Sequence, residues 1–308
     1  MGTSRLVMRI VSASVVIAEH AGSIIRHIAS EGKLGILEKG VNDLQTEADR
    51  RAQRFITASL SKRFSKIHII GEETLTPLEQ VADNWLELGF AEDILAKNCP
   101  QNLLSTKEED VVIWVDPLDG TAEYAYGFLD HVTVLIGVAI RGKPIAGVIH
   151  QPYYNYKVPG AILGRTVWGV VGLGAFGMEK YSIHSDKRIV TTSRLRRSKT
   201  NTEAIEALKP DDVIYAGGCG HKTMLVIEGA ASAYVYGNPG CKKWDTCAPE
   251  AVLRSLGGQM TDLHGNKFQY HKDVQRENTG GVLATVSNHK WCLSRIPQCV
   301  KDVLPTEG

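Results

Sequence analysis

The sequence has no excess of one charge, few aromatic residues and few cysteines. Its 308 residues carry a net charge of +1, and aromatic residues make up 7% of the chain. A balanced charge excludes the large basic surface with which proteins hold nucleic acid or an anionic membrane. We therefore expect a small-molecule ligand and neither of those partners, with local groups holding any polyanion.

The cysteines and the apolar segments exclude further classes of protein. The six cysteines include no C-x-x-C pair, and no H-x(3–5)-H tract completes a zinc site. The N-terminal segment lacks the layout of a secretory signal peptide. No uninterrupted apolar run approaches the roughly 18 residues that a membrane span needs. Reduced thiols and a cytoplasmic location are the resulting expectations.

The first part of the chain is expected to combine helices with an antiparallel sheet. Apolar periodicity predicts helices at 6–32, 43–64 and 79–97. Short apolar or alternating runs predict strands at 67–70, 111–115, 132–140 and 144–150, with two more between 161 and 178.

From about Ile189 the pattern changes to alternating strands and helices. This alternation predicts an α/β second part after an α+β first part, so the fold class is α/β. We place the boundary near Tyr181 to Lys187, which gives two parts, 1–185 and 186–308.

The glycine-rich run from Gly172 to Gly177 fits the G-x-G-x-x-G pattern of dinucleotide-binding proteins. It lies between two strand-like segments, whereas that pattern needs a turn from a strand into a helix. Glycines of a tight hairpin are the favoured interpretation. An NAD-binding oxidoreductase is kept as a rival, which a test of NAD binding would decide.

The strongest chemical signal is the segment Asp116-Pro117-Leu118-Asp119-Gly120-Thr121, which follows the apolar run 111–115. Two carboxylates at the end of a buried strand can hold a hard divalent cation, and oxygen-only ligation favours Mg²⁺ over zinc. The alternative is a polar turn stabilised by an aspartate side chain.

Other acidic residues also have two interpretations. Glu72 follows the strand at 67–70, and Asp245 opens a predicted helix, where it could be a helix N-cap. Asp43 and Asp49 bracket Thr46 near another helix start and could cap it or face solvent. Taken together, in this order along one chain, these residues are hard to explain as caps.

With these residues the chain resembles the lithium-sensitive, magnesium-dependent phosphatases related to inositol monophosphatase. The matching segments are Gly71-Glu72-Glu73, Trp114 to Thr121, and Trp244 to Glu250 followed by Gly257-Gly258. The chain is still more similar to the 3'(2'),5'-bisphosphate nucleotidases of animals. That likeness rests on Asp43 to Asp49, Gln151 to Tyr156, Leu163 to Thr166 and Pro239 to Asp245, and it extends from about Leu6 to Pro305.

The resemblance implies a layered αβαβα sandwich of the inositol monophosphatase and sugar phosphatase type, with the active site between its two parts. It implies two or three Mg²⁺ ions, inhibition by Li⁺, and a ligand set of Glu72, Asp116, Asp119, Asp245 and the Leu118 carbonyl. Asp49 and Thr121 would orient and deprotonate the attacking water. Gly120 and Thr121 would also contact the substrate.

Two turns in the second half carry the expected nucleotide contacts. Each ends a strand before a helix, and exposed glycine amides with a lysine suit a phosphate. The resemblance points to Ser193, Gly218 and Lys222. Arg196 stands where the related proteins have a histidine contact, so its base or ribose contact is left open. Without the resemblance both turns would be ordinary strand-to-helix connections.

The function that the resemblance implies is removal of the 3'-phosphate of 3'-phosphoadenosine 5'-phosphate to give AMP. The 2',5' isomer and the sulfated 3'-phosphoadenosine 5'-phosphosulfate are further candidate substrates. An inositol polyphosphate 1-phosphatase or an inositol monophosphatase is the nearest rival, and a catalytically silent nucleotide-binding protein is a third. A monomer is expected.

Overall fold

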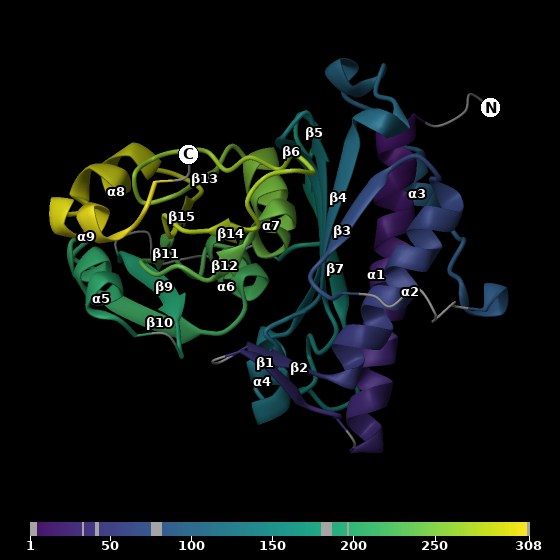
Figure 1. Ribbon diagram of the computed structural model, residues 1–308, viewed down its shortest axis with the longest axis horizontal. Coiled ribbons are helices and arrows are strands. Elements are labelled where there is room, and N and C mark those ends of the chain that lie inside the picture. Colours follow the sequence, from purple (N-terminus) through teal and green to yellow (C-terminus); the bar gives the residue numbers. More distant parts are fainter. Residues whose placement is uncertain are drawn as a thin grey trace.

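The computed structural model describes residues 5–32, 34–40, 43–74, 82–179, 187–195 and 197–306. Two sheets and three groups of helices stack as α, β, α, β, α layers (Figure 1). Three apolar clusters fill the spaces between the layers. The first lies between the first helix layer and the first sheet, the second surrounds the middle helices between the two sheets, and the third lies between the second sheet and the outer helices. The expected layered α/β architecture is confirmed.

The first helix layer consists of α1 (Leu6–Glu31) and α2 (Glu47–Arg63). The apolar stripe of α1 is buried, and the helix ends at Gly32, whose φ of 70° is a left-handed conformation that glycine adopts readily. Within the described chain, α1 alone has the length and hydropathy of a membrane-spanning helix, although 67% of that window is buried inside the protein. Such burial is typical of a core helix.

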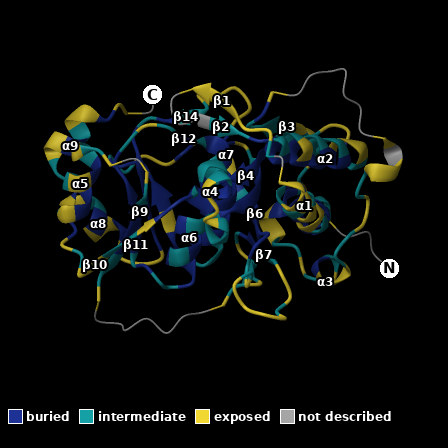
Figure 2. Ribbon diagram, turned by 90° about the horizontal axis from the view of Figure 1, so that it is seen from below, coloured by how far each residue is buried: buried dark blue, intermediate teal, exposed yellow. Residues whose placement is uncertain are grey.

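The first sheet packs against these helices. Its strand order is β3-β4-β5-β6-β7-β8, and only β3 and β4 are parallel. The bounds are β3 (His68–Gly71), β4 (Val111–Asp119), β5 (Thr133–Ile140), β6 (Lys143–Gln151), β7 (Arg165–Val170) and β8 (Gly174–Phe176). Every residue of β4 is buried, as its continuous apolar run predicts (Figure 2).

The middle layer consists of α6 (Cys219–Ile227) and α7 (Lys243–Ser255), which contact both sheets. Helix α7 approaches the first sheet closely, because a Cβ at Gly147 would lie 2.2 Å from the Ala248 carbonyl oxygen. This close approach joins the two parts of the chain and brings the start of α7 towards the end of β4.

The second sheet has the order β10-β9-β11-β15-β13, with β9 parallel to β10 and β11. Its strands are β9 (Ile189–Ser193), β10 (Asp212–Ala216), β11 (Ala233–Tyr236), β13 (Gln259–Thr261) and β15 (Val282–Thr285). The outer helices are α5 (Lys199–Glu206), α8 (His289–Arg295) and α9 (Gln298–Val303).

Short elements complete the described chain. Two small ribbons pair β1 (Leu37–Gly40) with β2 (Asp43–Gln45) and β12 (Cys241–Lys242) with β14 (Glu277–Asn278). Short helical turns are α3 (Glu92–Leu95), α4 (Thr121–Tyr126), η1 (Asp83–Trp85), η2 (Gln101–Leu103), η3 (Glu108–Asp110) and η4 (Leu129–His131).

Two helix predictions are wrong in extent. Residues 43–45 form strand β2, and the helix expected at 43–64 begins only at Glu47. In place of a helix at 79–97 the described residues form only η1 and α3. The Glu87 backbone amide donates to Ser59 Oγ at 3.1 Å and its carboxylate accepts from the Gly89 amide at 2.6 Å, so these groups hold a non-helical turn.

The glycine-rich run 172–177 begins in the connection between β7 and β8, continues through β8 and ends at Gly177, directly after that strand. Gly172 has a φ of 90° and Gly174 a φ of 116°, so the hairpin interpretation is confirmed. The boundary proposed at 185–186 lies outside the described residues and stays a prediction.

Candidate active site

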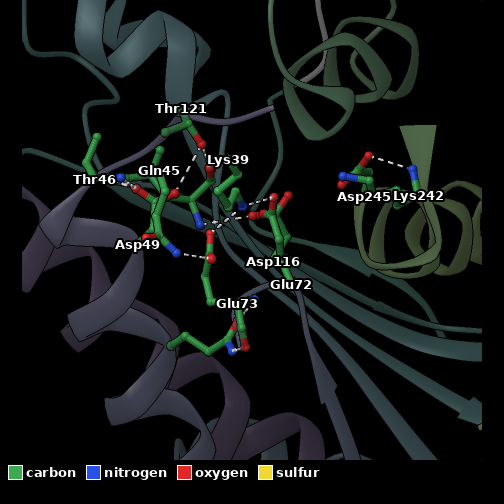
Figure 3. Close-up of polar contacts among 12 residues, drawn as sticks. Lys39, Gln45, Thr46, Asp49, Glu72, Glu73, Asp116, Thr121, Lys242 and Asp245 are labelled. Carbon is green, nitrogen blue, oxygen red and sulfur yellow. Dashed lines mark hydrogen bonds and ion pairs between the residues drawn. The ribbon is translucent and has the colours of Figure 1, made fainter. Parts of the chain in front are cut away.

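Four acidic residues from three segments of the chain line one cavity of about 140 Å³ at the end of β4. Figure 3 labels three of them, Glu72, Asp116 and Asp245. Because β3 and β4 are parallel, their carboxyl ends meet at one edge of the sheet, and the Glu72 amide donates to the Val115 carbonyl at 3.0 Å. The turn of α7 supplies the remaining acid. The cavity lining includes all five predicted metal-binding residues: Glu72, Asp116, Leu118, Asp119 and Asp245.

Asp119 is fixed by three hydrogen bonds. Its carboxylate accepts the amides of Cys219 and Gly220, each at 2.8 Å, and the Thr133 hydroxyl at 2.7 Å. A Cβ at Gly218 would lie 2.7 Å from Asp119 Oδ2, so this turn needs glycine there. In this glycine-rich turn, where exposed glycine amides were expected to suit a phosphate, the amides of Cys219 and Gly220 hold a carboxylate instead.

Burial and mutual repulsion perturb the acids of the cavity. Burial raises the pKa of Asp119 to about 6 and that of Glu72 to about 8, and neighbouring carboxylates add to both effects. Burial and the charges of Glu72 and Asp119 raise the pKa of Asp116 well above its usual range, and burial also raises the pKa of Asp245. Crowded, desolvated carboxylates of this kind favour binding a cation.

Lys39 of β1 contacts the acidic pair that follows β3 (Figure 3). Its Nζ lies 3.1 Å from Glu72 Oε1 and 2.8 Å from Glu73 Oε1. Although burial alone would lower it, these two glutamates raise the pKa of Lys39 above its usual value.

In the described residues no three His, Cys, Asp or Glu side chains already form a set that could hold a metal ion, so the carboxylates of the acidic cavity must move closer together to do so.

The donor atoms of the cavity nevertheless fit Mg²⁺ rather than a softer metal. The set described above consists of carboxylate oxygens and the Leu118 carbonyl. Cys241 lines the neighbouring cavity, and its contact with the Cys219 thiol together with burial raises the pKa of Cys241 well above its usual range. Oxygen donors without thiolates are the ligands that Mg²⁺ prefers.

Asp49 and Thr121 are in contact, as the proposed proton path requires. Thr121 Oγ1 lies 3.1 Å from Asp49 Oδ1 and 3.0 Å from the Leu118 carbonyl oxygen. The other Asp49 oxygen accepts the Thr46 amide at 2.7 Å and the Thr46 hydroxyl. Burial is the main cause that raises the pKa of Asp49 to about 6.

Asp49 and Asp245 each combine two roles that the sequence analysis treated as alternatives, stabilising a helix N-terminus and belonging to the acidic site. Each is the third residue of its helix, and Asp245 accepts the Lys242 amide at 2.7 Å just as Asp49 accepts that of Thr46 (Figure 3). Both therefore stabilise a helix N-terminus, and Asp245 also faces the acidic cavity. The side chain of Asp43 lies outside the described part of the chain.

A second cavity of about 180 Å³ adjoins the first and shares several residues with it, Asp119 and Thr121 among them. Its lining includes four of the predicted substrate contacts beside Thr121: Gly120, Ser193, Gly218 and Lys222. Lys222 donates to the Gly218 carbonyl, and its charge lowers the pKa of Asp119. Arg196 lies outside the described residues.

Three residues in this region were not predicted from the sequence. Thr133 opens an ordinary apolar strand, Lys39 lies in an exposed ribbon, and Glu123 lies in the first turn of α4. A search for carboxylates beyond the recognised motifs could have found only Glu123.

A larger cavity of about 650 Å³ lies elsewhere, beside Arg188 and Trp291 in the second part, away from the acidic residues.

The match to a family model places the protein in a class. Residues 7–301 match the model of the inositol monophosphatase family, and the chain belongs to this family. Solved structures agree on the fold. The extragenic suppressor protein suhB of Bartonella henselae is similar with a TM-score of 0.68 at 20% identity, covering 93% of this chain and 97% of that one.

Within this family the chain is similar to several individual proteins. The chain is 52% identical over 304 residues to human 3'(2'),5'-bisphosphate nucleotidase 1, covering 98% of each protein. It is 36% identical to the nucleotidase of the same description from Dictyostelium discoideum, covering 92% of this chain and 94% of that protein. Identity to inositol monophosphatase 3 of Danio rerio is 31%, over 94% of this chain and 84% of that protein.

Proposed function

We propose that this protein is a Mg²⁺-dependent 3'(2'),5'-bisphosphate nucleotidase. It removes the 3'-phosphate of 3'-phosphoadenosine 5'-phosphate, or the 2'-phosphate of the isomer, and releases AMP. The observation that carries this proposal is the pair of adjoining cavities. One is lined by the acidic residues, and the other by Ser193, Gly218 and Lys222. The high identity to nucleotidases supports a nucleotide rather than an inositol phosphate.

Glu72, Asp116, Asp119, Asp245 and the Leu118 carbonyl would hold the metal. Bound there, Mg²⁺ would neutralise the charge of the phosphate and acidify a water molecule. One solved relative of the same fold was crystallised with Mg²⁺ and phosphate. Two or three ions and inhibition by Li⁺ are part of the proposal, because a small hard ion suits the same oxygen ligands.

The chain supplies the base for the attacking water. The Thr121 hydroxyl accepts the proton of the water and passes its own to Asp49 Oδ1, which lies 3.1 Å away. Asp49 can accept it because its other oxygen is held by Thr46, which fixes the orientation of the carboxylate. Lys222 holds the phosphate that is not cleaved. The monomeric state and cytoplasmic location stay predictions.

Phosphate release from a small panel tests the proposal. The panel contains adenosine 3',5'-bisphosphate, an inositol bisphosphate and an inositol monophosphate, each with and without Mg²⁺. We expect Mg²⁺-dependent release that is fastest from the adenosine compound. Faster release from either inositol phosphate would replace the nucleotidase by an inositol phosphatase, and release without Mg²⁺ would overturn the metal assignment.

Asp119→Asn sharpens the test because it keeps the shape of the side chain and removes its charge. Turnover and Mg²⁺ affinity should collapse while the fold survives. Asp262→Asn is the matched control, since Asp262 is also buried and accepts backbone amides, at 2.7 and 2.9 Å, but lies outside both cavities. Near-normal rates in Asp119→Asn would contradict the assignment.

A further inference from the structure

Glu123 is a buried carboxylate in the substrate cavity that the proposed chemistry does not use. It lies in the first turn of α4, two residues after Thr121, and only 4% of it is exposed. It lines the 180 Å³ cavity together with Ser193 and Lys222. The other carboxylates in that lining are the proposed metal ligands Glu72, Asp119 and Asp245.

One side of the Glu123 carboxylate is fixed and its charge is paired. Arg194 Nη2 lies 3.2 Å from Glu123 Oε1, and the Arg194 guanidinium stacks 4.2 Å above the Phe128 ring. A Cβ at Gly217 would lie 1.9 Å from Glu123 Cδ, so the carboxylate packs directly against the Gly217 backbone. The carboxylate is therefore held in one orientation.

The other oxygen faces the turn where the phosphate would react. A Cβ built on Gly120, between Asp119 and Thr121, would lie 3.7 Å from Glu123 Oε2. Within the described chain, Oε2 accepts no hydrogen bond, whereas Oε1 accepts that of Arg194. Oε2 is not sealed inside the protein, so a ligand in this cavity can donate a hydrogen bond to it.

A bisphosphorylated ligand has few hydrogen-bond donors, because its phosphate oxygens are acceptors. The donor nearest the reacting phosphate is the hydroxyl group on the neighbouring carbon. An unpaired carboxylate would repel the phosphate, but Arg194 balances the charge of Glu123.

We propose that Glu123 Oε2 accepts a hydrogen bond from the hydroxyl adjacent to the phosphate being removed. Glu123 is then a specificity-determining residue that selects ribonucleotides, with a 2'-hydroxyl beside the 3'-phosphate, over 2'-deoxyribonucleotides. This inference rests on the proposed nucleotidase function. It deepens that function by naming the group on the sugar that the site recognises.

The test compares kcat/KM for adenosine 3',5'-bisphosphate and its 2'-deoxy analogue. A hydrogen bond to a charged group corresponds to a preference of about 10- to 150-fold for the ribose compound in the wild type. Glu123→Gln, which removes the charge of the acceptor, should reduce that ratio by about 10-fold or more. Glu228→Gln is the matched control, because Glu228 is also buried and paired with an arginine, Arg165 at 2.6 Å, but lies outside this cavity. Its ratio should equal that of the wild type.

The outcomes separate the inference from the function on which it rests. If the wild type cleaves both compounds with similar kcat/KM, or if Glu123→Gln keeps the full ratio, the inference is overturned and the nucleotidase function stands. If the wild type cleaves neither compound, both are overturned. The wild-type ratio needs no variant, so the inference can be refuted even if Glu123→Gln does not fold.

Discussion

Thr133→Val should weaken Mg²⁺ binding without any change in the proposed metal ligands. Thr133 is fully buried at the start of β5, and its hydroxyl donates to Asp119 at 2.7 Å. Valine has nearly the same shape but no hydroxyl, so Asp119 would keep the two amides of α6 and lose its third donor. We expect a folded protein with a less well stabilised Asp119 carboxylate.

The magnitude follows from the hydrogen bond that is lost. A hydrogen bond to a charged group contributes about 1.5–3 kcal/mol, which corresponds to roughly 1–2 pKa units. Burial already raises the pKa of Asp119 to about 6, and the Thr133 hydroxyl opposes that rise. In the variant the pKa of Asp119 should therefore rise further, so protons compete with Mg²⁺ more strongly as the pH falls.

Calorimetric titration with Mg²⁺ at about pH 6.5 and pH 8.5 measures this competition directly. The affinity of Thr133→Val should be lower by about 10-fold or more at the lower pH and closer to that of the wild type at the higher pH. Thr285→Val is the control, because Thr285 is also fully buried but its hydroxyl contacts His289 in the second part. Wild-type affinity at both pH values would refute the argument that Thr133 positions Asp119.

Three further predictions follow from the same cavities. Thr121→Ala should lower kcat by on the order of 100-fold, while Thr121→Ser keeps more activity because the hydroxyl that contacts Asp49 remains; equal rates in the two variants would argue against the proton path. Lys222→Ala should lower kcat/KM for adenosine 3',5'-bisphosphate by about 10- to 150-fold and change the cleavage of a small monophosphate little. An equal loss of kcat/KM with a small monophosphate would show that Lys222 does not bind the phosphate that is not cleaved. Burial raises the pKa of Glu72 from its ordinary 4.5 to about 8. Between these two values the folded metal-free protein keeps a proton that the unfolded chain has lost, so its thermal stability should fall as the pH rises from about 4.5 to about 8, and fall less with Mg²⁺. A flat profile without metal over this range would contradict this.

Local patterns in the sequence predicted the elements that frame the site. The apolar stripe of α1, its stop at Gly32 and the continuous apolar run of β4 all form as expected. The motifs around Glu72, Asp116 and Asp245 face one cavity because β3 and β4 are parallel and α7 packs closely on their sheet.

Long-range contacts account for what the sequence did not predict. Asp43 to Gln45 continue a helical pattern but pair with β1 instead, and strand pairing of this kind depends on a partner segment rather than on local propensity. The amides that hold Asp119 come from residues about 100 positions further along the chain. A glycine turn looks the same in a sequence whether its amides bind a phosphate or a carboxylate.

Asp49 and Asp245 stabilise the fold in addition to belonging to the proposed active site. Each accepts the backbone amide at the start of its own helix, and such caps contribute about 0.5–2 kcal/mol. A natural substitution at either residue would therefore reduce the amount of folded protein, in addition to any loss of the activity that we propose for these residues. Even in a duplicate gene whose activity is no longer needed, substitutions at these two positions would destabilise the folded protein. The acidic residues can therefore remain after selection for turnover has ended.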